Sequence, residues 1–304
     1  MNTKEVGCSC GIVVCIFLII TCFIKCSSKD ESEETSYGFI SYSLKWEQAM
    51  SGYKNPQKLR YCFYPQEKGA MTQIEGDADG LHFTLPPDKY RLLIFNCDAD
   101  NIQFRNMESF ETAEAYIPET KASGSVTSSG RTPLYGIAIN DLEVEANEGA
   151  QNKREFSPTP LIREVTLDIK IDGMEHIKDC KGALSGVPSA FSLSKLEIVP
   201  DKTTTVNFEA TPSKEGVKAN IMILGTAPKH GEPPPAPPKN EVKLDFTLTD
   251  GSTSSTTLDL GESIGTTEGN NVNVDVSVTV EKTASFTVKI NKWEVSAGDN
   301  MVIE

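Results

Sequence analysis

The sequence predicts an all-β protein with two tandem β-sandwich domains, residues 37–156 and 157–304, that follow an export signal. Short stretches rich in β-branched and aromatic residues recur between turn residues along nearly the whole chain. No long stretch has the period of an amphipathic helix, and no repeat of fixed length is visible. Prolines at 158 and 160 interrupt the pattern, and we place the domain boundary there.

The N-terminus has the composition of a bacterial lipoprotein signal. Residues 6–24 are apolar and uncharged, and an acidic segment follows them. We expect residues 1–25 to be the signal peptide and residues 26–36 to be a tether. Cleavage before Cys22 follows a small residue, Thr21, whereas cleavage before Cys26 would follow Lys25. Either cysteine could be the lipid (palmitate) acceptor, and a single-pass anchor is the alternative because about 19 apolar residues can just span a bilayer.

The first domain is expected to contain five strands and one helix. The predicted strands alternate apolar and polar residues or, at 90–96, contain a continuous apolar run (residues 92–95), which is typical of burial on both faces. Residues 107–116 are expected to form a short helix, and residues 143–154 a hairpin end or linker. The strands are predicted at residues 37–46, 59–64, 81–85, 90–96 and 134–139.

The second domain opens with the clearest strand, residues 161–171, in which Val165, Leu167 and Ile169 share one face and Thr166 and Asp168 the other. Further strands are predicted at residues 190–199, 204–210, 219–224, 241–249, 254–260, 272–280 and 285–293.

Charge and cysteine content limit which partners and which disulfides the chain can have. The chain has a net charge of −14 and no basic patch, which argues against nucleic acid as a partner. Of the eight cysteines, only Cys62, Cys97 and Cys180 lie beyond the signal region. A Cys62–Cys97 disulfide is the possible pairing if the two strands are neighbours, but we favour buried free thiols.

No catalytic or cofactor motif is present, so we expect no enzyme activity, no cofactor and no metal site. The three histidines, His82, His176 and His230, have no metal-ligand spacing. Residues 77–80 and 98–101 have alternating carboxylates but lack the distal Glu of a full calcium loop, so turns are favoured. Trp46 and Trp293 lie in predicted strands, where packing in the core is the default.

Several segments resemble fimbrillin-like lipoproteins of Bacteroidia. Among them are residues 85–96 (LPPDKYRLLIFN) and 160–173 (PLIREVTLDIKIDG). The other segments are residues 98–105, 108–116, 182–187 and 285–293. Residues Lys29, Asp30 and Glu31, after Cys26, resemble the lipoprotein surface-export signal of Bacteroidota.

This resemblance implies two transthyretin-like sandwiches of the fimbrillin superfamily, which includes the anchor and tip subunits of type V pili. Such subunits are surface-exposed, lipid-anchored proteins of the outer membrane or fimbrium. They act in cell adhesion, and their partners are other fimbrial subunits that assemble by strand exchange. In stalk subunits an Arg-specific protease removes the first strand.

In this chain, residues 47–58 contain no Arg, and the first Arg, Arg60, lies in a predicted strand. We therefore expect strand 37–46 to stay in place in an anchor or terminal subunit. The alternative function is a monomeric surface lipoprotein that binds glycans or proteins for nutrient uptake.

Overall fold

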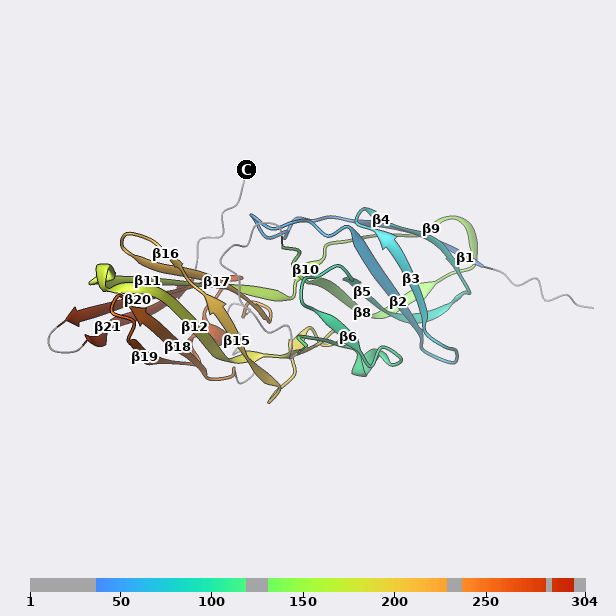
Figure 1. Cartoon of the computed structure of the whole chain (residues 1–304). Coiled ribbons are helices and arrows are strands. Elements are labelled where there is room, and N and C mark those ends of the chain that lie inside the picture. Colours follow the sequence, from blue (N-terminus) through green and yellow to red (C-terminus); the bar gives the residue numbers. More distant parts are fainter. Residues whose placement is uncertain (1–36, 119–130, 229–236, 283–285, 298–304) are drawn as a thin grey trace, which may run out of the picture. The chain divides into compact units, whose positions relative to one another are not determined.

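The protein is almost entirely β-structure. The computed structural model describes residues 37–118, 131–228, 237–282 and 286–297, and helical structure in these ranges is limited to short segments (Figure 1). The strands of this part form four hydrogen-bonded sheets. None of its helices is long and apolar enough to cross a membrane. The predicted all-β sandwich class is therefore confirmed.

The first half of the described chain builds one eight-stranded sheet in the order β10-β8-β5-β2-β3-β4-β1-β9. Apolar side chains from alternate positions of these strands form one core, with Tyr61, Phe63 and Leu92 fully buried. The strands are β1 (Gly38–Leu44), β2 (Lys58–Pro65), β3 (Thr72–Asp77), β4 (Gly80–Leu85), β5 (Asp88–Asn96), β8 (Tyr135–Val144), β9 (Asn147–Phe156) and β10 (Thr159–Pro160).

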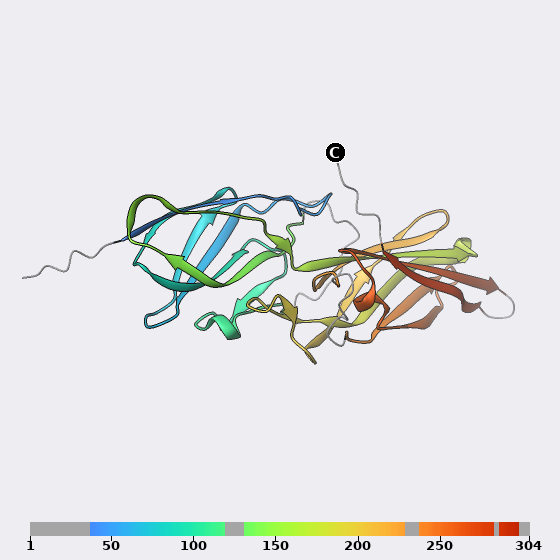
Figure 2. The same cartoon turned by 180° about the vertical axis from the view of Figure 1, so that it is seen from behind.

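The second half packs a five-stranded sheet, β16-β17-β11-β20-β21, against a four-stranded sheet, β15-β12-β18-β19. Both sheets contribute Val, Ile, Leu and Phe side chains to one core, which is how a sandwich removes two apolar sheet faces from water. Strands β20 and β21 lie side by side in both views, and the short helix α1 is visible in the reverse view (Figures 1 and 2).

The elements of these two sheets are β11 (Ile162–Asp172), β12 (Ile177–Pro188), β15 (Thr203–Glu209), β16 (Thr211–Pro212), β17 (Gly216–Leu224), β18 (Asn240–Leu248), β19 (Thr253–Gly261), β20 (Asn271–Lys282) and β21 (Phe286–Ala297), with the helical segments η3 (Met174–His176) and α1 (Ser263–Thr266).

A third core cluster draws residues from both sides of Pro158. It lies around a small sheet in the order β14-β13-β7-β6, in which β7 pairs with β13 from the second half. The strands of this sheet are β6 (Gln103–Arg105), β7 (Glu114–Tyr116), β13 (Ala190–Ser192) and β14 (Glu197–Ile198).

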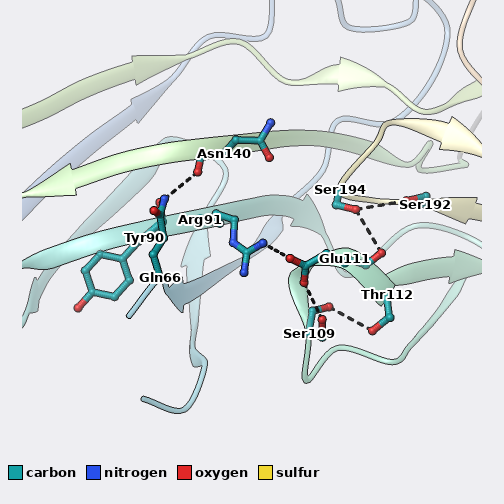
Figure 3. A network of polar contacts seen from close by, with 9 residues as sticks. All are labelled: Gln66, Tyr90, Arg91, Ser109, Glu111, Thr112, Asn140, Ser192 and Ser194. Carbon is teal, nitrogen blue, oxygen red and sulfur yellow. Dashed lines mark hydrogen bonds and ion pairs between the residues drawn. The ribbon is translucent and has the colours of Figure 1, made fainter. Parts of the chain in front are cut away.

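The predicted helix at residues 107–116 is wrong. The segment contains only a three-residue turn, η1 (Phe110–Thr112), followed by β7. Glu111 of the turn accepts hydrogen bonds from Ser109 and from Arg91 of β5, and these two donors hold the pKa of its carboxyl below the usual value (Figure 3). Strand β7 pairs with β6 and with β13. Its backbone N–H and C=O groups are therefore used in these ladders and are not free to form helical hydrogen bonds.

The other predicted strands are confirmed with shifts of a few residues at their ends, except that residues 190–199 form two short strands with a turn between them. Strand β5 is buried on both faces from Leu92 to Asn96, as its apolar run indicates. Strands β3 and β12 were not predicted, and residues 147–156 form a strand, β9, where a hairpin end or linker was expected at residues 143–154.

Candidate assembly site at the first strand

Strand β1 lies inside the eight-stranded sheet, with a hydrogen-bonded neighbour on each side. It pairs antiparallel with β4, from Gly38 opposite Leu85 onward. On its other side it runs parallel to β9, and Tyr42 lies beside Arg154. Removing β1 would therefore leave two open strand edges that face each other, which is the geometry that accepts a donated strand.

The inward face of β1 fills the core beneath it. Ile40, Tyr42 and Leu44 are 0%, 2% and 9% exposed. The Tyr42 ring packs edge-on against Phe156, with ring centroids 5.1 Å apart, and lies 6.3 Å from Phe63. These three side chains occupy alternate sites along the strand, so they define the pockets that any replacement strand would have to fill.

Burial raises the pKa of the Tyr42 hydroxyl to about 12. Because the unfolded chain loses this proton first, the folded state binds more protons between pH 10 and pH 12, and its stability falls as the pH rises. The loss is about 2 kcal/mol at pH 12 for a shift of this size and approaches about 3 kcal/mol only at higher pH. We expect Tyr42→Phe to leave stability at pH 7 nearly unchanged and to reduce the loss above pH 10. Urea unfolding at pH 8, 10 and 11 measures this, with the half-exposed Tyr37 replaced by Phe as control.

The connection from β1 to β2 is fixed to the rest of the fold along its length. The indole of Trp46 donates to Ala78 O at 3.0 Å, and its ring packs edge-on against Tyr135. The backbone N–H of Met50 donates to the hydroxyl of Tyr135 at 2.8 Å. Further along, Gln57 N donates to an Asp98 carboxylate oxygen at 2.8 Å. A protease needs an extended, mobile segment, and these contacts hold this one in place. Trp46 is half-buried against the core, as predicted.

Arg60 lies in β2, as expected, and not in the connection. Strand β2 is paired on both sides, with β3 and β5, so the backbone at Arg60 is part of two ladders. Its guanidinium forms an ion pair with Glu75 at 3.0 Å. The connection between β1 and β2 therefore offers no Arg to an Arg-specific protease, and the first available Arg is protected by the sheet.

Strand β21 presents a second assembly feature, an edge that has no partner strand among the described residues. It is 12 residues long and pairs with β20 on one side, at the end of its sheet. Trp293 on this strand is 39% exposed, so the predicted core position for Trp293 is wrong. The reason is that an edge strand has a neighbouring strand on one flank only, so its side chains stay partly open to solvent.

The proposed cysteine pairing is contradicted. Strands β2 and β5 are neighbours, but Cys62 lies opposite Leu93 whereas Cys97 donates its backbone N–H to Lys58 O. The two cysteines are thus four residues apart in register, about 13 Å, which is beyond the reach of a disulfide. Cys62, Cys97 and Cys180 are free thiols in the structure.

These thiols should differ in reactivity. Burial raises the pKa of all three thiols, to about 12 for Cys62 and Cys180, but only Cys97 is partly exposed and so within reach of a reagent. Since the thiolate is the reactive form, we expect one thiol to react with Ellman's reagent at pH 8 in a folded chain that begins at Ser36, and three in denaturant. Fewer than three thiols in denaturant without reductant would reveal a disulfide and contradict the register argument.

The two acidic segments are turns, and the remaining predicted site residues lie outside the described ranges. Residues 77–80 form the β3–β4 turn, and in residues 98–101 the carboxylates of Asp98 and Asp100 accept backbone N–H groups from Gln57 and Thr132. No group of three metal-ligating side chains occurs in the described ranges. Cys22, Cys26, Lys29, Asp30 and Glu31 lie outside them, as does His230.

No pattern in the sequence marks β9, the parallel neighbour of β1, as a strand. Its residues are mostly polar, so no apolar alternation marks it as a strand. In the structure the Asn152 side chain of β9 is 5% exposed and exchanges two hydrogen bonds with the backbone of Glu145. A buried asparagine needs such partners, but its burial is visible only in the fold.

Comparison with known proteins gives consistent results. A family model described as a domain of unknown function, DUF5119, matches residues 26–209. The chain is 22% identical over 258 residues to a Bacteroides ovatus protein named as a candidate fimbrium anchoring subunit, Fim4B, with 80% of this chain and 76% of that protein covered.

Solved structures share the fold. A candidate adhesin from Bacteroides ovatus matches with a TM-score of 0.65 at 20% identity, covering 85% of this chain and 97% of that chain. The fimbrial anchor protein Mfa2 of Porphyromonas gingivalis matches with a TM-score of 0.54 at 11% identity, covering 86% and 96%.

Proposed function

The chain belongs to the DUF5119 family and is a fimbrillin-like protein, and on this premise we propose that it is a fimbrial anchor or a terminal (minor) subunit in cell adhesion. The similarity to fimbrial and adhesion proteins indicates a fimbrial or adhesive role at the cell surface. We propose further that residues 37–156 and 157–304 are two tandem domains, that the subunit assembles by strand exchange, and that it has no catalytic activity.

The observation that carries this proposal is how the first strand is held in the sheet, together with the absence of Arg from the connection that follows it. Stalk subunits of the fimbrillin superfamily are expected to lose their first strand to an Arg-specific protease. Here β1 is hydrogen-bonded to a strand on each side. The connection from β1 to β2 is fixed by hydrogen bonds from Trp46, Met50 and Gln57. Arg60, the first Arg after it, is inside a sheet. A subunit that keeps its first strand has no vacant groove there, so we expect it to end a fibre.

The open edge of β21 supports assembly at the other half of the molecule. A strand from a neighbouring subunit can pair with this edge through backbone hydrogen bonds, and the exposed Trp293 adds an apolar contact beside it. We propose this edge as the contact with another fimbrial subunit.

Lipid attachment is the second part of the proposal. We propose that Cys22 or Cys26 carries the lipid and that Lys29, Asp30 and Glu31 direct the protein to the outer surface of the outer membrane. Labelling cells with a palmitate analogue and comparing Cys22→Ala with Cys26→Ala identifies the acceptor, since only one substitution should abolish labelling.

Two measurements on surface-shaved cell material test the function. The N-terminus of the surface form should lie at Cys22 or Cys26; a start between Gln57 and Tyr61 would show that β1 is removed and that the subunit is a stalk repeat. The tagged protein, run unboiled in SDS, should co-migrate with a ladder that collapses on heating. A lipidated monomer alone would favour a solitary binding lipoprotein instead.

A further inference from the structure

The outer face of the eight-stranded sheet is hollowed along β1. Because Ile40, Tyr42 and Leu44 point into the core, Ser41 and Ser43 point outward. Longer side chains stand on both neighbouring strands, His82 on β4 and Lys153 on β9, each directly beside Ser41 in the register. Short side chains between two taller rows leave a trough of about 570 Å³ along the strand.

The lining of this trough is polar and carries both signs of charge. Asp77 and Asp79 supply acceptors at one end, and Lys153 supplies donors on the β9 side. The carboxylate of Glu155, which also lines the trough, pairs with Lys45 at 2.8 Å. The charges of the lining leave a small negative excess, which disfavours an anion, and the trough favours a neutral ligand that both donates and accepts hydrogen bonds.

An exposed aromatic pair stands beside the polar floor. The rings of Phe39 and His82 are nearly parallel, at 9°, with centroids 6.2 Å apart. Phe39 is 41% exposed, and His82 lines the trough itself. Both project from the outer face, as does Ser41. An aromatic ring left in water on a strand otherwise lined by serines offers an apolar face to a ligand whose other groups are polar.

The backbone pairing and the lining of the trough argue against a peptide, a polyanion or a lipid chain as its ligand. Strand β1 is paired with β4 and with β9, so an extended peptide has no free strand edge to join. A polyanion would meet Asp77, Asp79 and a chain of net charge −14. A lipid acyl chain would meet a floor of hydroxyl groups. Recognition must therefore use side chains alone. The polar side chains can bond to hydroxyl groups of a ligand, and the aromatic ring beside them can pack against its apolar face.

We propose that this trough binds a neutral carbohydrate chain, with a sugar ring against Phe39 and His82 and its hydroxyl groups bonded to Ser41, Ser43 and the charged rows. This function goes beyond the fimbrial proposal and does not rest on it, because it uses only the outer face of the eight-stranded sheet. A monomer that never assembles would bind in the same way.

The test uses the folded full-length chain in detergent and a panel of neutral oligosaccharides: mannan, β-glucan and galactan fragments and mucin O-glycans, together with heparin as a polyanion. Binding is measured by saturation-transfer NMR and by calorimetry. We expect at least one neutral glycan to bind and heparin not to bind. Phe39→Ala should weaken binding about tenfold, and Ser41→Leu, which fills the floor and removes a hydroxyl, should abolish it.

The matched control is Trp293→Ala, which removes an aromatic side chain of nearly the same exposure, 39%, from β21. It should leave glycan affinity unchanged, and thermal unfolding should show that all three variants are folded. The proposal is overturned if no neutral glycan binds at tens of millimolar, if heparin binds in their place, or if Phe39→Ala has no larger effect than Trp293→Ala. The SDS ladder of Phe39→Ala reports separately on assembly.

Discussion

A chain that begins at Glu47 and so lacks β1 is expected to lose the cooperative fold of its eight-stranded sheet, and a synthetic peptide of residues 37–46 is expected to restore it. Three side chains, Ile40, Tyr42 and Leu44, leave the core, and each contributes about 1.5–3 kcal/mol by burial. Two ladders of backbone hydrogen bonds are lost as well. The sum is comparable to the whole stability of a domain, about 5–15 kcal/mol.

The alternation along β1 provides matched peptides for this experiment. A peptide with Tyr42→Asp places a charge in the core and should not restore the fold. A peptide with Ser43→Thr changes an outward position and should restore it as well as the natural sequence does. Thermal unfolding followed by circular dichroism, with and without peptide, gives the comparison. Equal rescue by both peptides would mean that the pockets beneath β1 do not select the strand.

Strands with an apolar residue at every second position can be predicted from the sequence. Strands that contain glycines for packing reasons cannot, because glycine is usually taken as the sign of a turn. Strand β11 has Val165, Leu167 and Ile169 on its inner face, so its sequence specifies both its type and its orientation. Strand β12 contains Gly182 and Gly186, which suggest turns. In the structure a Cβ on Gly182 would meet the Phe208 ring at 2.4 Å, so this glycine makes room for packing within a strand.

The candidate site was predictable only in part. The absence of Arg between β1 and β2 and the strand position of Arg60 both follow from the sequence. That β1 lies between β4 and β9 does not, because a parallel pairing between residues more than 100 positions apart leaves no local pattern. The trough depends on this same pairing, since Ser41 and Ser43 form its floor only when taller residues stand on both sides.

The second large effect is expected at Arg163, on β11. Its side chain is 3% exposed, and in the described part of the chain its hydrogen bonds go to the backbone carbonyls of Ile264, Thr267 and Gly269. Helix α1 has only four residues, so its carbonyl groups have few partners within the helix. Burial lowers the pKa of the guanidinium to about 10, which still leaves it charged at neutral pH.

Arg163→Leu should therefore reduce the free energy of unfolding by about 3–5 kcal/mol, because several buried carbonyls would lose their donors at once. Arg163→Lys should cost less but still more than 1 kcal/mol, since an ammonium group lacks the planar, forked set of donors that reaches all three carbonyls. The control is Lys218→Ala, which removes an exposed cation paired with Asp168 and should cost about 0–1 kcal/mol. Urea unfolding at pH 7 measures all three. If Arg163→Leu costs no more than the control, the α1 segment does not depend on Arg163, and the carbonyls of its last turn find water instead.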